Sequence, residues 1–140
     1  MTALAASRLV KELATATTRR FPVAASAAIY EGAQVALSGA GGAAVAVPAS
    51  ANAALRIVGV AMADGNNLNG AAGAVNVDVK LGVFLMNNDA GDPLAIGDTG
   101  APCYVTDDNT VAKTSASNSK PQAGVVWSID ASGGVWVRYA

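Results

Sequence analysis

The chain has 140 residues, with nine Lys and Arg, ten Asp and Glu and no His, so its formal net charge at pH 7 is -1. A chain of this length can bury a sizeable core, and a single self-sufficient domain is expected. Only 14% of the residues are charged and 52% are hydrophobic, which argues against a disordered chain. The near-neutral balance also argues against a nucleic-acid partner, because there is no excess of positive charge to neutralise phosphates.

The residue types that catalysis most often uses are scarce. The chain contains no histidine and a single cysteine, Cys103. Most general acid–base catalysis near neutral pH, the Ser-His-Asp triad and most zinc sites need imidazole. One cysteine can form neither an internal disulfide nor a thiolate metal cage. The sequence therefore predicts a protein that is not an enzyme and uses no cofactor or metal. No apolar run approaches the roughly 18 residues of a membrane-spanning helix, so no membrane partner is expected.

Residues 1–20 differ in pattern from the rest of the chain. The i, i+3, i+4, i+7, i+8 spacing of one helical face is followed by Ala6, Leu9, Val10, Leu13 and Ala14. Four basic residues and one acidic residue give this segment a formal charge of +3. Two interpretations stay open: a frayed terminus, or a basic arm, in part a short helix, that becomes ordered against a partner. The candidate binding residues of the arm are Arg8, Leu9, Lys11, Leu13, Arg19, Arg20 and Phe21.

From Phe21 onward the hydrophobic period changes to two, which indicates half-buried strands. The clearest run is 75–81, with apolar residues at 75, 77, 79 and 81. In the run 135–139, Val135, Val137 and Tyr139 face one way, and Trp136 and Arg138 face the other. Further strands are expected at 34–37, 44–47, 56–62, 83–86, 102–106, 110–113 and 123–130. Turns are expected at 39–42, 107–109 and 132–134, and 63–74 and 114–121 are expected to be exposed loops.

About nine or ten short strands with regular turns predict an all-β protein, an antiparallel sandwich, jelly roll or barrel-like domain over residues 21–140. A weak internal duplication appears at an offset near 65 residues, where 57–60 resembles 122–126. On the same offset, Ile29 and Gly32 match Leu94 and Gly97, and 75–77 resembles 135–137. Two related sets of strands suit a jelly roll or paired Greek keys, although chance matches are common in an Ala-, Val- and Gly-rich chain.

The two tryptophans and the acidic clusters are the remaining candidates. Trp127 shares the parity of Val125 and Ile129, which predicts a core position. Trp136 shares the parity of Arg138, and this pair is a candidate interface anchor because both residue types are enriched at hot spots. Stacking on a sugar, or lying flat on the sheet, are the alternatives for Trp136. The acidic clusters 89–92 and 107–109 lack the spacing of a calcium loop and are better explained as turns.

The order of these segments resembles the small head decoration, or cement, proteins of tailed bacteriophages. The residues that carry the resemblance are an Arg-Arg-Phe-Pro entry at 19–22, Ile-Tyr-Glu-Gly-Ala-Gln-Val at 29–35, Val-Gly-Val-Ala at 58–61 and Ala-Gly-Val-Val at 123–126. The resemblance covers most of residues 20–139. It implies a β-rich structural protein on the outer surface of the virion, where it cements neighbouring major capsid subunits at local symmetry axes. The implied partners are the major capsid protein and a second copy of the chain, as a dimer by preference or as a trimer.

Two other classes stay open. A carbohydrate-binding module would use Trp136, Tyr104 or Tyr139 as stacking platforms, although the aromatic content of 5% counts against it. A fibre or adhesin subunit would share the composition and the β-sandwich. It would form open filaments, whereas a cement protein on its own would form small closed oligomers.

Overall fold

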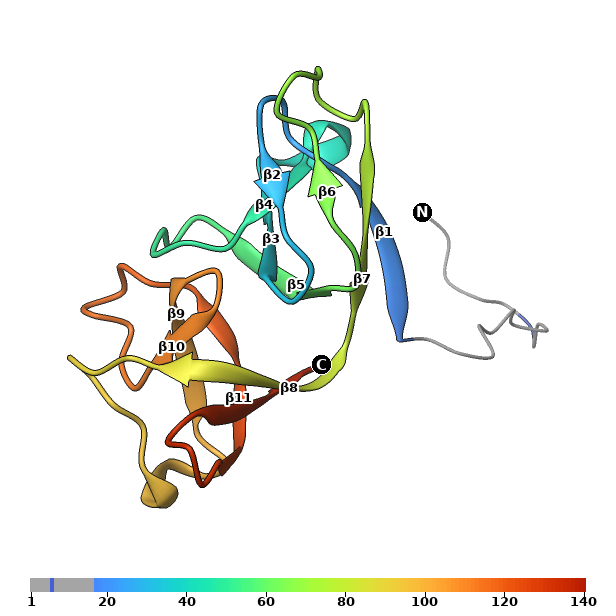
Figure 1. Cartoon of the computed structure of the whole chain (residues 1–140). Coiled ribbons are helices and arrows are strands. Elements are labelled where there is room, and N and C mark those ends of the chain that lie inside the picture. Colours follow the sequence, from blue (N-terminus) through green and yellow to red (C-terminus); the bar gives the residue numbers. More distant parts are fainter. Residues whose placement is uncertain (1–5, 7–16) are drawn as a thin grey trace.

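The computed structural model describes residue 6 and residues 17–140, and it shows two β units that lie side by side (Figure 1). The predicted arm residues Arg8, Leu9, Lys11 and Leu13 lie outside the described residues. The chain passes from one unit to the other between β7 (Asn76–Lys80) and β8 (Gly82–Asn88), and the C-terminus returns to the same place (Figure 1).

The first unit, called the first sheet, has five strands in the spatial order β1-β7-β5-β3-β4, each antiparallel to its neighbours. A parallel bridge between Val23 and Ala46 brings the two outer strands together and curls the sheet. The strands are β1 (Thr18–Pro22), β3 (Gln34–Ser38), β4 (Val45–Pro48), β5 (Arg56–Ala61) and β7 (Asn76–Lys80), with the small pair β2 (Ala28–Ile29) and β6 (Gly65–Asn66) and the 3-10 turn η1 (Gly41–Ala43) beside them.

The second unit is a closed five-stranded barrel in the order β10-β8-β12-β11-β9. A short parallel pairing of β10 with β8 closes it, and the other pairs are antiparallel. Its elements are β8 (Gly82–Asn88), η2 (Ile96–Asp98), β9 (Pro102–Asp107), β10 (Thr110–Ala112), β11 (Gln122–Ile129) and β12 (Val135–Tyr139).

The all-β, antiparallel, barrel-like fold expected from the sequence is confirmed. Each segment with a period of two contains a strand, and the predicted turns at 39–42, 107–109 and 132–134 join hairpins. The parity also holds where it was clearest, since Val77 and Val79 in β7 and Val135 and Val137 in β12 are all at most 1% exposed.

Two predictions for the ends and loops are wrong. Thr18–Arg20 is not part of the arm but forms most of β1. This strand pairs with the edge of β7 that faces away from β5. The segment 63–74 is not simply an exposed loop, because it contains β6 and the buried Asn67. The Nδ2 of Asn67 donates to the carbonyl oxygens of Val23, Ala24 and Ala71 at 2.8–3.2 Å and ties the loop to the sheet.

The first sheet and the barrel repeat one topology, which confirms the predicted duplication. Read from β8, the closed barrel has the order β8-β12-β11-β9-β10. These strands correspond, in this order, to β1-β7-β5-β3-β4 of the first sheet. The residue pairings correspond as well: Val35 lies opposite Gly59 and Cys103 lies opposite Gly124, each next to a bulge. The match of 57–60 with 122–126 is therefore confirmed at Gly59 and Gly124.

The other two sequence matches are displaced. The structural equivalent of Gly32 is Gly100, not Gly97. Their φ angles are +88 and +86, and their backbone nitrogens donate at 2.9 Å to the carbonyl oxygens of Ala61, at the end of β5, and Val126, within β11. Val135 corresponds to Val77 rather than Val75, because their neighbours Asp78 and Trp136 occupy the same position in the two pairings with β1 and β8. Insertions between the strands shift the offset from one element to the next.

The side chain of Gln34 joins the two units. It is fully buried, and its amide nitrogen donates to the carbonyl oxygens of Asp107 at 2.9 Å and Thr110 at 3.4 Å in the β9–β10 hairpin. Its amide oxygen accepts a 2.7 Å hydrogen bond from the hydroxyl of Tyr139 in β12. Around it a single hydrophobic cluster combines Leu55 and Val60 of the first sheet with residues of the barrel.

Candidate functional site

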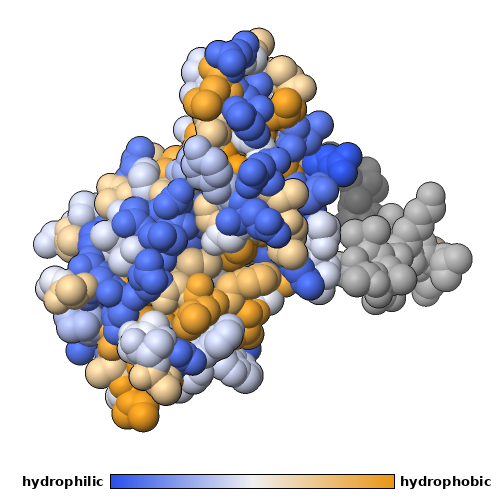
Figure 2. Space-filling view, viewed as in Figure 1, coloured by the Kyte–Doolittle hydropathy of each residue, from blue (hydrophilic) through white to orange (hydrophobic). Residues whose placement is uncertain are grey.

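The most distinctive surface of the described part is the outward side of β8, β12 and β11 on the barrel. Two rows of side chains cross these strands. Val83 lies opposite Arg138, which lies opposite Val125, and Leu85 lies opposite Trp136, which lies opposite Ser128. We call this surface the apolar face and define it by Val83, Leu85, Val125, Trp127, Trp136 and Arg138. Hydrophobic side chains gather over β8 in the space-filling view (Figure 2).

Three large hydrophobic side chains of the apolar face are open to solvent. Val83 is 37% exposed, Leu85 is 46% exposed and Trp127 is 56% exposed. Sets of neighbouring exposed apolar side chains mark interaction surfaces more often than single ones do. Val83 and Leu85 were not singled out from the sequence, although their shared parity in 82–88 was a usable signal.

The prediction that Trp127 lies in the core is wrong. The register of β11 shifts at a bulge between Gln122 and Gly124, and again between Val126 and Ser128, with Trp127 as the extra residue of the second bulge. A bulge adds one residue to one strand, so the alternation inferred from parity no longer holds beyond it. Val126 is consequently 1% exposed and Trp127 points outward.

Trp136 and Arg138 lie on the apolar face, at alternate positions of β12. Trp136 is half-buried and Arg138 is exposed. The Trp136 indole Nε1 donates to Oδ1 of Asp130 at 3.2 Å, which fixes the ring in the β11–β12 hairpin. Hydrogen bonds from the side chain and backbone of Ser132, together with that from Trp136, lower the pKa of Asp130. The carboxylate therefore stays charged and holds the indole edge.

The equivalent side of the first sheet is charged. Arg20 and Asp78 occupy the positions that Leu85 and Trp136 occupy in the barrel. The Arg20 guanidinium donates to both carboxylate oxygens of Asp78, at 2.8 and 3.2 Å, and these hydrogen bonds lower the pKa of Asp78 and raise that of Arg20. One topology thus presents an ion pair on one unit and a hydrophobic pair on the other.

The other predicted arm residues that the structure describes also belong to the fold. Arg19 donates to the carbonyl oxygen of Val58 at 2.7 Å, and its guanidinium lies 5.5 Å from the ring centre of the half-buried Phe21. Arg19, Arg20 and Phe21 therefore have partners within the first sheet and are not brought together with Trp136 and Arg138.

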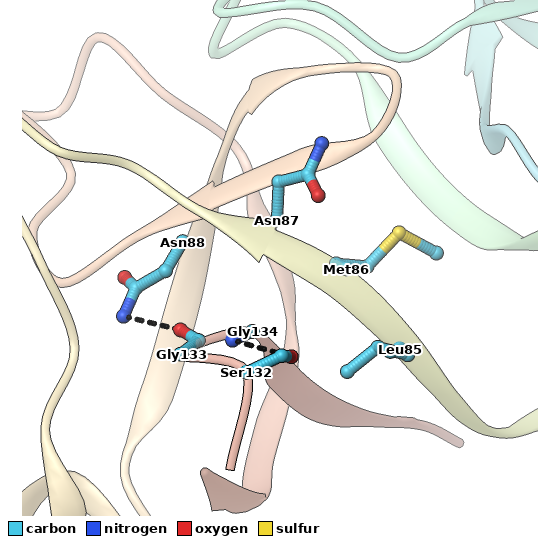
Figure 3. A pocket seen from close by; sticks show the side chains of 7 residues that line it. All are labelled: Leu85, Met86, Asn87, Asn88, Ser132, Gly133 and Gly134. Carbon is cyan, nitrogen blue, oxygen red and sulfur yellow. Dashed lines mark hydrogen bonds between the residues drawn. The ribbon is translucent and has the colours of Figure 1, made fainter. Parts of the chain in front are cut away.

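A hollow of about 470 Å³ lies next to Leu85 at the end of the apolar face (Figure 3). In the close-up, Asn88 turns toward the β11–β12 hairpin, where its Nδ2 donates to the carbonyl oxygen of Gly133 at 3.3 Å. The lining is completed by Met86, Asn87, Ser132 and Gly134. It offers amide and hydroxyl groups for hydrogen bonding, and none of its side chains is ionisable.

The acidic clusters form turns, as expected. Oδ1 of Asp89 accepts a 2.9 Å hydrogen bond from the backbone of Gly91, and Oδ1 of Asp107 accepts one of the same length from Asn109. Within residue 6 and residues 17–140 there is no group of three or more His, Cys, Asp or Glu side chains that could hold a metal ion. The same part of the chain has no helix long and apolar enough to cross a membrane.

The tyrosines weighed as sugar platforms differ in access. Tyr139 is 3% exposed and its hydroxyl is bonded to Gln34, so its ring is not available for stacking. Tyr104 is half-buried in β9.

Comparisons of the chain with protein-family models, with curated proteins and with solved structures gave no match.

Proposed function

We propose that this chain is a structural virion protein that binds the outer surface of an icosahedral phage capsid and cements neighbouring major capsid subunits. The observation that supports the proposal is the apolar face of a closed barrel, where Val83 and Leu85 are exposed on β8 and Trp127 is exposed on β11, with β12 between the two strands. Backbone pairing around the barrel holds the strands that carry these side chains in place, so little backbone freedom is lost when a protein partner covers them.

The face is small, which suits a partner that is present in many identical copies. A few exposed apolar side chains with a tryptophan and an arginine can anchor an interface without making a permanent one. On a capsid the same site recurs around each symmetry axis, and a closed oligomer of this chain, a dimer by preference, would engage several sites at once. Such multivalent attachment raises the avidity without requiring a strong single contact.

The basic arm is the second part of the proposed capsid contact. Because β1 begins at Thr18, the arm is confined to residues 1–17, and its candidate contacts are Arg8, Leu9, Lys11 and Leu13. The arm would reach along a capsid subunit while the barrel face binds beside it. The conformational entropy that such a segment loses on becoming ordered is lost only when it binds, and this loss lowers the affinity.

The test is co-sedimentation with expanded phage heads that lack the decoration protein. The wild-type chain is expected to pellet with the heads at saturable stoichiometry, and Val83→Asp and Leu85→Asp are expected to weaken binding at least tenfold. Thr18→Asp is the matched control, because Thr18 occupies the position of Val83 on the first sheet and is exposed. Wild-type protein that remains in the supernatant contradicts the proposal.

A carbohydrate-binding module is the second candidate, and Trp127 is the observation that favours it. Its exposed ring lies beside a hollow of about 320 Å³ that Thr99 and Arg138 also line. An aromatic ring with neighbouring hydrogen-bond donors can stack on a sugar. Glycan-array binding that is lost in Trp127→Ala, with no binding to heads, would favour this candidate over the capsid proposal.

A further inference from the structure

Trp127, Arg138 and the turn at Thr99 line one hollow of about 320 Å³ on the barrel. Its lining is mostly apolar, with Val125 beside the exposed Trp127 ring, and Arg138 is its one ionisable side chain. The Thr99 hydroxyl already donates a 2.7 Å hydrogen bond to the carbonyl oxygen of Ile96. Recognition of a charged group in this hollow therefore depends on Arg138.

Arg138 has no acidic partner among residue 6 and residues 17–140. The ion pairs within this part of the chain use three other basic side chains, those of Arg20, Lys113 and Lys120. Arg138 is exposed, and its neighbours across β8 and β11 are the apolar Val83 and Val125. A guanidinium is charged at any ordinary pH, and its planar N–H donors match the two oxygens of a carboxylate. Its matching anion has to come from outside the barrel.

The repeated topology shows what the hollow lacks. Lys80 in the first sheet and Arg138 in the barrel are equivalent, so both units have a basic residue at this position. The residues before the two equivalent glycines are Glu31 in the first sheet and Thr99 in the barrel. The first sheet thus has an acidic residue where the barrel has a neutral one. The barrel retains only the positive charge of this pair of positions.

A single cation in apolar surroundings favours a carboxylate over a phosphate. Sites that bind phosphate groups of nucleic acids gather several Lys and Arg side chains, and this hollow has one. A carboxylate on a protein surface often has an apolar neighbour in the same chain. Such a neighbour can pack on the Trp127 ring while the carboxylate accepts hydrogen bonds from Arg138.

We propose that this hollow binds an acidic side chain of a partner protein, with an apolar side chain next to it in the partner's sequence. The carboxylate pairs with Arg138, and the apolar side chain covers Trp127. That the partner is a capsid subunit rests on the proposed function, whereas the preference for a carboxylate rests on the hollow alone. Exposed ion pairs contribute little affinity, so the role of Arg138 is to select among apolar partner surfaces.

The experiment is an NMR titration of the full-length chain with two peptides, N-acetyl-Leu-Glu-Leu-amide and N-acetyl-Leu-Gln-Leu-amide. The readout is the indole N–H signal of Trp127, which lines the hollow and is one of only two tryptophans in the chain. The Glu peptide is expected to shift this signal saturably and to bind about threefold more tightly than the Gln peptide. Arg138→Gln should abolish the difference. Lys80→Gln is the matched control, because it removes the equivalent charge of the first sheet, and the difference should remain.

Equal affinity of the two peptides, or no saturable shift with either, would overturn the inference. Saturable binding of glucuronate without binding of the Glu peptide would also overturn it, and would favour the carbohydrate-binding candidate. The outcome is separate from that of the co-sedimentation test. Chains that pellet with heads but do not prefer the Glu peptide contradict only the carboxylate site, and chains that prefer it but never pellet contradict only the capsid function.

Discussion

Gly59 in β5 and Gly124 in β11 occupy the same position in the two units, and each lies where a neighbouring strand leaves no room for a side chain. A Cβ on Gly59 would lie 2.6 Å from the carbonyl oxygen of Lys80, and a Cβ on Gly124 would come still closer to the carbonyl oxygen of Arg138. Lys80, the last residue of β7, and Arg138, the last but one of β12, are themselves equivalent residues. The repeated topology thus depends on the same close approach twice.

Replacing either glycine is therefore expected to destabilise the protein. Gly59→Ala and Gly124→Ala should each lower the free energy of unfolding by about 2 kcal/mol, because backbone atoms have to move to admit the methyl group. Gly59 has the additional strain of a φ of +139. Chemical denaturation measures the effect. Gly42→Ala is the control, since nothing lies within 4 Å of its Cβ, and a loss as large as at Gly59 would contradict the explanation.

The contact between Gln34 and Tyr139 is expected to couple the two units. Gln34→Ala should cost about 3 kcal/mol, because it leaves the Tyr139 hydroxyl and two carbonyl oxygens without their buried partner. Tyr139→Phe should cost about 1–2 kcal/mol for the unpaired amide oxygen. Tyr30→Phe, at a side chain that is 64% exposed, should change the stability by less than about 0.5 kcal/mol.

A double-mutant cycle separates this contact from the rest of the junction. The two costs should fall short of additivity by about 1 kcal/mol, since both substitutions remove the same hydrogen bond. Additive costs would mean that the 2.7 Å hydrogen bond contributes nothing of its own. Unfolding of Gln34→Ala in two separate transitions would show that this side chain makes the two units cooperative.

The stability of the barrel should fall in acid through Asp89. Hydrogen bonds from the Thr106 hydroxyl and the Gly91 backbone, with a smaller effect of Lys120, lower the pKa of Asp89. A carboxyl whose pKa is lower in the folded state contributes stability above its unfolded pKa and loses it as the pH falls through the folded pKa. The free energy of unfolding is thus expected to decrease below about pH 4, and Asp89→Asn should flatten this decrease.

Asp108 provides a control of opposite sign. Burial, together with the neighbouring charge of Asp107, raises the pKa of Asp108, so its ionised form opposes folding at neutral pH. Asp108→Asn is expected to stabilise the protein at pH 7 and to lose this effect as the pH falls below about 4, where the carboxyl is protonated in both states. The check is the difference in denaturation midpoint between each variant and the wild type, measured from about pH 2.5 to 7. This difference should change with pH in opposite directions for Asp89→Asn and Asp108→Asn, and a change in the same direction would contradict the explanation.

The boundary of the arm can be tested by truncation. A chain that lacks residues 1–15 is expected to keep its fold, because β1 and the Thr17–Leu81 hydrogen bond remain. A chain that lacks residues 1–22 loses all of β1, so β7 has no partner along its outer edge, and the first sheet should unfold. Amide hydrogen exchange in β7 distinguishes the two, and protection in the shorter chain would contradict the role of β1.

Most of the strands could be predicted from the sequence, because apolar and polar residues alternate in a strand that has one buried and one solvent-exposed side. In 75–81 and 135–139 the alternation alone predicts which side chains are buried, and Val77, Val79, Val135 and Val137 are. The same reasoning failed for Trp127, because a bulge changes the parity without leaving a mark in the composition. It also failed for β1, because its basic residues have the pattern of a solvent-exposed tail. Their partners, the Val58 carbonyl oxygen for Arg19 and Asp78 for Arg20, are far away in the sequence.

The sequence by itself determined the all-β class, the hairpin turns and the existence of a repeat, since these depend on local periodicity and local turn residues. Only the tertiary structure decided that Leu85 and Trp136 form a hydrophobic pair where the first sheet has Arg20 and Asp78, and that Gln34 joins the two units through Tyr139. These relationships link residues 51 to 105 positions apart in the chain. Long-range register depends on every intervening loop and bulge, and no local pattern records it.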